Sequence, residues 1–200
     1  MTDFAQEPGP ARVVGLVLAA GAGRRMGGPK ALVDDWLPRS VAVLREGGCA
    51  EVTVVLGASA PEAAALIPGV PVVVAQDWAE GMGASLRAGL QELSDRLDGP
   101  GRLDGLGADA VLVSLVDLPD VGPDVVRRLL DRPLERATLA RATYDGRPGH
   151  PVLIGADHVA GIIASATGDR GARDYLAAHP HDEVECGDLA TGVDVDRPPR

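Results

Sequence analysis

The stretch RVVGLVLAAGAGRRMGGPK, residues 12–30, joins a nearly continuous apolar run to a glycine-rich loop. The apolar part, residues 12–20, is typical of a central strand that is buried on both faces of a parallel sheet. The loop, residues 21–30, holds four glycines, two arginines and one lysine. Glycine lets backbone amides turn toward an anion, and the cationic side chains add charge. The stretch therefore predicts a strand that ends at a polyphosphate site.

Lys30 strengthens the case for a phosphate loop. It is the only lysine among 19 Lys and Arg residues, so the chain otherwise carries its positive charge on arginine. A compact ammonium on a flexible stem suits bridging between phosphate oxygens, whereas arginine offers a planar fork. The alternative is an ordinary glycine-rich turn in a chain that contains 26 glycines. We favour the functional interpretation.

Two familiar phosphate loops do not fit the spacing. A P-loop needs Ser or Thr after its Gly-Lys pair, and here Pro29 and Ala31 flank Lys30. A dinucleotide fingerprint needs glycine where Met26 stands. The loop therefore belongs to another class of nucleotide-binding protein.

The rest of the chain repeats the alternation of strands and helices. Hydrophobic residues make up 46% and aromatic residues 2% of the chain, which suits a core of Val, Leu, Ile and Ala. The fold predicted is a single three-layer α/β/α domain with a Rossmann-like, mostly parallel sheet over residues 12–200, preceded by a disordered tail, residues 1–11. Further strands are predicted at 51–57, 70–75, 109–116, 136–144, 150–154 and 182–186, and the leucine stripe of one long helix at Leu86, Leu90, Leu93 and Leu97. Residues 98–108 are expected to form a loop and residues 145–149 the turn of an antiparallel hairpin.

Charge and composition exclude several classes of function. A net charge of -10 disfavours nucleic acid and anionic membrane as partners. The chain has no run of about 18 apolar residues, and its first ten residues do not resemble a signal peptide, so we expect a cytoplasmic protein. Cys49 and Cys186 lack metal-ligand spacing and are interpreted as inert thiols.

Asp117 directly follows the apolar strand 109–116. Open α/β sheets place their ligands at the carboxyl ends of strands, and a carboxylate there can hold Mg²⁺. The alternative is an acidic loop residue that begins a turn before Pro119. The position alone does not decide between the two.

Several segments resemble one family when taken in order. Residues 18–30, 77–87, 116–119, 149–152 and 168–173 are similar to segments of the nucleotidyltransferases related to the molybdenum-cofactor guanylyl- and cytidylyltransferases, the MobA-like NTP transferase family. The resemblance implies a sheet of the nucleotide-diphospho-sugar transferase type and a Mg²⁺-dependent reaction. Ala20 resembles the cytidylyltransferase branch. Ala75, where Asn is common, and residues 34–36, where a glycine turn is usual, depart from the pattern.

The resemblance, together with the chemistry of the residues, gives a set of candidate site residues. The catalytic candidates are Arg25, Lys30 and Asp117. The nucleotide-binding candidates are Leu18, Ala19, Ala20, Gly21, Gly23, Arg25, Lys30, Gly81, Gly83 and Ser85. The acceptor-binding candidates are His150 and Arg170, and the metal ligands are Asp117, Asp194 and Asp196. The alternatives are a structural hydrogen bond for His150, helix capping for Ser85 and Arg170, and a solvated acidic tail for Asp194 and Asp196.

The implied reaction is transfer of CMP from CTP to molybdopterin or the molybdenum cofactor, with release of pyrophosphate. The product would pass to a molybdoenzyme of the xanthine dehydrogenase type. Guanylyl transfer from GTP to molybdopterin or phospholactate is the alternative within the same chemistry. A non-catalytic carrier or chaperone of the cofactor stays open as a different class, while a nucleotide-sugar pyrophosphorylase is disfavoured by the chain length.

Overall fold

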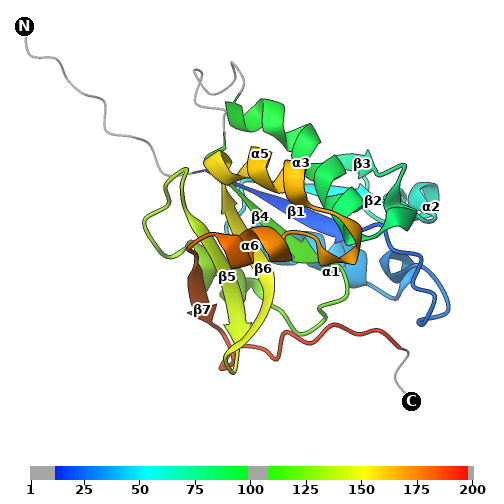
Figure 1. The fold of residues 1–200 in the computed structure, drawn as a ribbon. Coiled ribbons are helices and arrows are strands. Elements are labelled where there is room, and N and C mark those ends of the chain that lie inside the picture. The colour runs from blue at the N-terminus through cyan, green and yellow to red at the C-terminus, as the bar shows by residue number, and fades with distance from the viewer. Residues whose placement is uncertain (1–11, 99–107, 198–200) are drawn as a thin grey trace, which may run out of the picture.

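The computed structural model describes residues 12–98 and 108–197, and within them a single mixed sheet lies between two layers of helices (Figure 1). This confirms the predicted three-layer α/β/α architecture. The predicted tail, residues 1–11, lies outside the described residues. So do residues 99–107 of the predicted loop.

The sheet of the described residues has seven strands in the order β3-β2-β1-β4-β6-β5-β7. The pairs β1–β2, β1–β4, β2–β3 and β5–β7 are parallel, whereas β6 is antiparallel to both of its neighbours. β1 therefore lies at the centre of a parallel half, as the first strand of the sequence predicts. The strands are Val13–Ala19 (β1), Glu51–Leu56 (β2), Val72–Val74 (β3), Ala110–Leu115 (β4), Leu139–Tyr144 (β5), Arg147–Gly155 (β6) and Asp182–Glu185 (β7).

Alternate side chains of β1 enter two separate cores. Val13 and Val17 pack on one face of the sheet, and Leu16 and Leu18 pack on the other. All four are buried, which accounts for a strand that is apolar at nearly every position. Burying one such side chain stabilises the fold by about 1.5–3 kcal/mol relative to leaving it in water.

Helices cover both faces. The first face holds α1 (Trp36–Glu46), α2 (Ala60–Ala64) and α4 (Pro123–Leu130), and the second holds α3 (Met82–Asp98), α5 (Ala156–Ser165) and α6 (Arg173–Ala178). The predicted stripe of α3 is buried at Leu86, Leu90 and Leu93, while the side chain of Leu97 lies outside the described part. No helix in the described ranges is both long and apolar enough to cross a membrane.

The hairpin of β5 and β6 differs from its predicted bounds. β6 begins at Arg147 and pairs there with Tyr144, so the turn consists of Asp145 and Gly146 alone. Both have positive φ, 50° and 73°, as the central residues of a two-residue type I′ hairpin turn require. The predicted five-residue turn was therefore too long, because Pro148 lies inside the paired strand.

Three single-turn 3₁₀ helices were not predicted. They are η1 (Lys30–Leu32), η2 (Trp78–Glu80) and η4 (Gly168–Arg170). Each is too short to show a periodic pattern in the sequence. All three contribute residues to the same pocket, described below.

Candidate functional site

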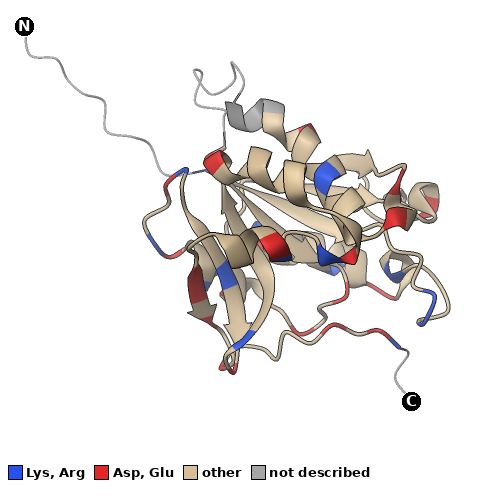
Figure 2. Ribbon diagram, in the orientation of Figure 1, with Lys and Arg blue, Asp and Glu red and all other residues tan. Residues whose placement is uncertain are grey.

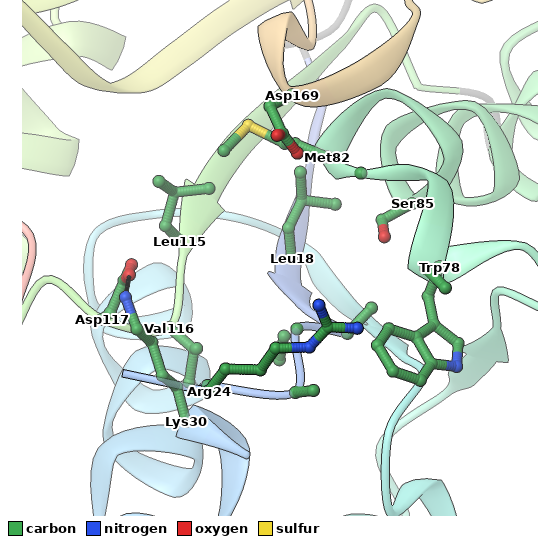
Figure 3. A pocket seen from close by; sticks show the side chains of 17 residues that line it. Leu18, Arg24, Lys30, Trp78, Met82, Ser85, Leu115, Val116, Asp117 and Asp169 are labelled. Atoms are coloured by element: carbon green, nitrogen blue, oxygen red, sulfur yellow. Dashed lines mark hydrogen bonds and ion pairs between the residues drawn. The ribbon is translucent and has the colours of Figure 1, made fainter. Parts of the chain in front are cut away.

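A pocket of about 390 Å³ opens at the carboxyl ends of β1 and β4 (Figure 3). This is the edge of a parallel sheet at which α/β proteins bind ligands. The lining residues come from β1, the loop after it, η1, η2, the start of α3, the end of β4 and η4. They are Leu18, Ala19, Ala20, Gly21, Ala22, Gly23, Arg24, Lys30, Trp78, Ala79, Gly81, Met82, Ser85, Leu115, Val116, Asp117 and Asp169.

The glycine-rich loop is folded tightly onto itself. The backbone amides of Met26 and Gly27 both donate hydrogen bonds to the carbonyl oxygen of Gly23, at 2.8 and 3.0 Å. Gly23 has φ +56°, and a Cβ there would lie 1.9 Å from the carbonyl oxygen of Gly28. Only glycine fits this position, so the sequence fixes the turn that leads into η1 and Lys30.

Lys30 lies between two carboxylates. Its Nζ donates to Oδ2 of Asp117 at 2.5 Å and to Oδ1 of Asp196 at 2.6 Å. Burial lowers the pKa of Lys30, but the hydrogen bonds and charges of the two carboxylates outweigh it and leave the pKa above its ordinary value. Lys30 is therefore an ammonium ion at neutral pH.

Three carboxylates meet beside this ammonium. Asp117 follows β4, while Asp194 and Asp196 belong to the C-terminal segment, and an oxygen of each lies within 4.8 Å of the others. Lys30 also lowers the pKa of Asp196. Hard oxygen ligands of this kind suit Mg²⁺ or Mn²⁺, and the ammonium already holds the place of a cation between two of them. These residues therefore fit a divalent metal.

The two neighbouring arginines of the loop have different surroundings. Arg24 lines the pocket and extends toward Trp78 (Figure 3). Arg25, the residue predicted from the sequence, is 74% exposed at its side chain and donates to Asp196 at 3.0 Å. Both residues are exposed. Sequence reasoning missed Arg24, because nothing in a pair of adjacent arginines tells which one lines the pocket.

Most of the predicted nucleotide-binding residues line the pocket. Leu18, Ala19, Ala20, Gly21, Gly23, Lys30, Gly81 and Ser85 do so, whereas Arg25 and Gly83 do not. A Cβ at Gly83 would lie 2.8 Å from the backbone of Thr167, so this glycine lets α3 approach the loop before η4. The hydroxyl of Ser85 points toward the pocket (Figure 3). Trp78 and Met82 were missed, although both lie in the segment 77–87 that carries the resemblance.

A second pocket of about 290 Å³ adjoins the first and shares Met82, Leu115 and Asp169 with it. It contains both predicted acceptor residues, His150 and Arg170. Its other lining residues combine apolar side chains with two more arginines and an aspartate: Leu118, Arg141, Pro148, Gly149, Val152, Ala172, Arg173, Leu176, Gly192 and Asp194.

The charged groups of the second pocket are not equivalent. Burial lowers the pKa of His150 to about 4, so the imidazole is neutral at neutral pH. Arg170 forms a bidentate pair with Asp174, and Arg141 donates to Glu183 at 2.7 Å. Arg173 lowers the pKa of His150 by its charge. The pocket can therefore offer positive charge and a neutral imidazole to an anionic molecule.

Comparisons with known proteins identify relatives of this chain. Residues 15–184 match the MobA-like NTP transferase domain. The nicotine blue oxidoreductase of Paenarthrobacter nicotinovorans is 36% identical over 92% of both chains. The molybdenum cofactor guanylyltransferase of Rhodobacter capsulatus is 33% identical over 59% of this chain and 57% of its own.

Solved structures show the same fold, and one of them contains a metal. Rv0371c of Mycobacterium tuberculosis superposes with a TM-score of 0.72 at 28% identity, covering 94% of this chain and 95% of its own. A second structure of that protein contains manganese and gives a TM-score of 0.68 at 26% identity, with 92% and 94% of the two chains covered. The glycine-rich loop, Lys30 and Asp117 follow the carboxyl ends of β1 and β4, where α/β sheets generally bind their ligands. The chain belongs to the MobA-like NTP transferase family.

Proposed function

We propose that this nucleotidyltransferase of the MobA-like type transfers CMP from CTP to the molybdenum cofactor and releases pyrophosphate. One observation carries the proposal. Lys30 and three carboxylates lie where the two pockets meet, with Asp117 lining the first pocket and Asp194 lining the second. A reaction that joins a nucleotide to an anionic acceptor needs cationic groups at this boundary.

In the proposed mechanism, the first pocket holds the nucleotide. Amides of the loop 21–28, the ammonium of Lys30 and the guanidinium of Arg24 hold the triphosphate. A divalent cation held by Asp117 together with Asp194 or Asp196 would add positive charge beside the phosphates. A phosphate oxygen of the acceptor forms a bond to the α-phosphorus as the bond to the β-phosphate oxygen breaks. Catalysis then consists of positioning and charge neutralisation, since the nucleophile is already an anion.

The second pocket receives the acceptor in this proposal. Its arginines suit a terminal phosphate, and its apolar residues suit the face of a flat ring system such as a pterin. His150 is neutral, so it can donate or accept one hydrogen bond without adding charge. After transfer, the product would pass to a molybdoenzyme of the xanthine dehydrogenase type.

The choice of CTP depends on Ala20, which resembles the cytidylyltransferase branch. The Rhodobacter capsulatus relative is named a guanylyltransferase, so GTP is the alternative nucleotide. The two are separated by measuring pyrophosphate release with CTP and GTP in turn, each with and without molybdenum cofactor. Mg²⁺ and Mn²⁺ are each supplied, and a chelator serves as the control. Release that requires CTP, acceptor and metal supports the proposal, and release only with GTP assigns the chain to the guanylyl branch.

Oxidoreductase activity is the second candidate, because the relative with 92% coverage of both chains is a nicotine blue oxidoreductase. The test supplies nicotine blue and a reduced nicotinamide dinucleotide as hydride donor, without nucleoside triphosphate. Bleaching of the dye with matching oxidation of the donor, and no pyrophosphate release in the first assay, favours this candidate. Tight binding of molybdenum cofactor without either reaction favours a carrier.

A further inference from the structure

The C-terminal segment after β7 crosses from the edge of the sheet to the carboxyl end of β4 (Figure 1). We call residues 187–196 the C-terminal strap. Acidic residues lie along the strap, which runs toward the basic loop after β1 (Figure 2). The strap supplies Asp194 and Asp196, two of the three carboxylates at the boundary of the pockets. The placement of these two carboxylates therefore depends on how the strap is held.

Two hydrogen bonds from Thr191 hold the middle of the strap in place. The backbone amide and the Oγ1 hydroxyl of Thr191 both donate to Oδ2 of Asp120, at 2.6 and 2.5 Å. Asp120 lies three residues after Asp117, and the amide of Val195 donates to the carbonyl oxygen of Asp117 at 3.0 Å. The strap is thus tied on both sides of Asp194 to the segment that carries Asp117.

Tyr144 supports the strap at the next residue. Gly192 has φ +62°, and a Cβ there would lie 2.1 Å from Cε2 of Tyr144. The ring cannot move away easily, because Tyr144 is buried and its hydroxyl donates to the carbonyl oxygen of His150 at 2.7 Å. The same ring therefore links the strap to the wall of the second pocket that carries His150.

We propose that Thr191, Asp120 and Gly192 are positioning residues, which set the affinity of the metal site and of the second pocket by fixing the strap. None of the three needs to touch a reacting atom. Loosening the strap displaces Asp194 and Asp196 from Asp117 and changes the wall of the second pocket at Gly192 and Asp194. The first pocket keeps all of its lining residues, since none of them belongs to the strap.

Thr191→Val is the sharpest variant, because it keeps the shape, the backbone amide and the charge but removes the hydroxyl. We expect its affinity for Mn²⁺, measured by electron paramagnetic resonance or calorimetry without nucleotide, to fall about fivefold. Hydrogen exchange of the peptide that contains Val195 should become faster in the metal-free protein. Thr191→Ser keeps the hydroxyl and should behave as wild type. Thr138→Val serves as a control for the same substitution at another site, where the hydroxyl accepts a hydrogen bond from the amide of Glu135.

Gly192→Ala provides an independent second variant. It should weaken Mn²⁺ binding by about tenfold or more, because the added methyl group must lift the strap from Tyr144. In both variants the KM of the acceptor should rise, while the affinity for nucleotide measured without divalent metal stays unchanged. Unchanged Mn²⁺ affinity and exchange in both folded variants would overturn the inference.

The expected rise in the KM of the acceptor rests on the proposed function, whereas the expected changes in Mn²⁺ affinity and in hydrogen exchange do not. Weaker Mn²⁺ binding by the variants of a protein that shows no transferase activity would therefore uphold the positioning role of these residues and reject the proposed reaction. Normal Mn²⁺ binding in both variants of an active transferase would reject the positioning role of the strap and uphold the proposed reaction.

Discussion

The ammonium of Lys30 occupies the space between Asp117 and Asp196, where a divalent cation would compete for the same oxygens. Two opposite effects follow for Lys30→Ala. Transfer activity should fall by about 10²–10³-fold, because a positive charge beside the triphosphate is lost. Affinity for Mn²⁺ alone should rise, because the competing cation is gone. Pyrophosphate release and calorimetric titration measure the two effects.

Lys30→Arg is the matched control for this prediction. It keeps the charge but replaces a compact ammonium with a planar fork, so activity should stay low while Mn²⁺ affinity stays close to that of wild type. Circular dichroism verifies that each variant is folded. Full activity of Lys30→Ala would contradict the role given to this side chain.

Arg24 and Arg25 test the orientation of the loop. Arg24 lines the first pocket, so Arg24→Ala should raise the KM for nucleotide about tenfold. Arg25 is mostly exposed and pairs with Asp196 at the surface, so Arg25→Ala should change the same KM less than threefold. Steady-state kinetics with varied nucleotide compares the pair. Equal effects of the two substitutions on this KM would show that the loop adopts a different conformation when nucleotide is bound.

At the level of single elements, Glu185 at the end of β7 fixes the turn between β5 and β6. Its carboxylate accepts hydrogen bonds from the amides of Gly146, Gly187 and Asp145 and from the hydroxyl of Thr143. These bonds, that of Gly146 first, lower the pKa of Glu185 to about 2. The carboxylate thus stabilises the fold above its ordinary pKa of 4.5, and the contribution is lost as the pH falls through about 2.

Glu185→Gln isolates that contribution. The variant should unfold at lower urea concentration than wild type at pH 6, and the difference should shrink as the pH falls from about 5 toward 2. Urea unfolding curves of both proteins at each pH provide the measurement. The effects of other carboxylates cancel in the comparison, so a difference independent of pH would contradict this role of the charge.

The elements also show where sequence reasoning succeeds and where it fails. β1 and the stripe of α3 could be predicted, because burial on two faces leaves a continuous apolar run and burial of one stripe leaves a periodic pattern. The bounds of the β5–β6 turn could not, because a paired Pro148 is exceptional in a strand. The single-turn η1, η2 and η4 leave no pattern, yet they shape the first pocket.

At the scale of the whole molecule, the place of Asp117 after an apolar strand made it a candidate metal ligand that the resemblance then favoured, whereas Asp194 and Asp196 were candidates by resemblance alone. Their approach to Asp117 depends on the path of the strap, which is set by the contacts of Thr191 and Gly192 with residues far away in the sequence. Spacing along the chain does not encode such a contact. The same holds for the choice between Arg24 and Arg25, which the dihedral angles of the loop decide.

The carboxylates connect the end of the described chain to the central strands, so a metal bound there should stabilise the whole domain. Ligand at 100 times its Kd adds about 2.7 kcal/mol to the free energy of unfolding when it binds only the native state. Mn²⁺ should therefore move the urea midpoint of wild type upward, and CTP should move it further. Asp117→Asn removes the carboxylate that pairs with Lys30 and lies close to those of Asp194 and Asp196, and its midpoint should not respond to Mn²⁺. A response equal to that of wild type would contradict this site. The comparison is clear because no other cluster of three candidate ligands occurs in the described part of the chain.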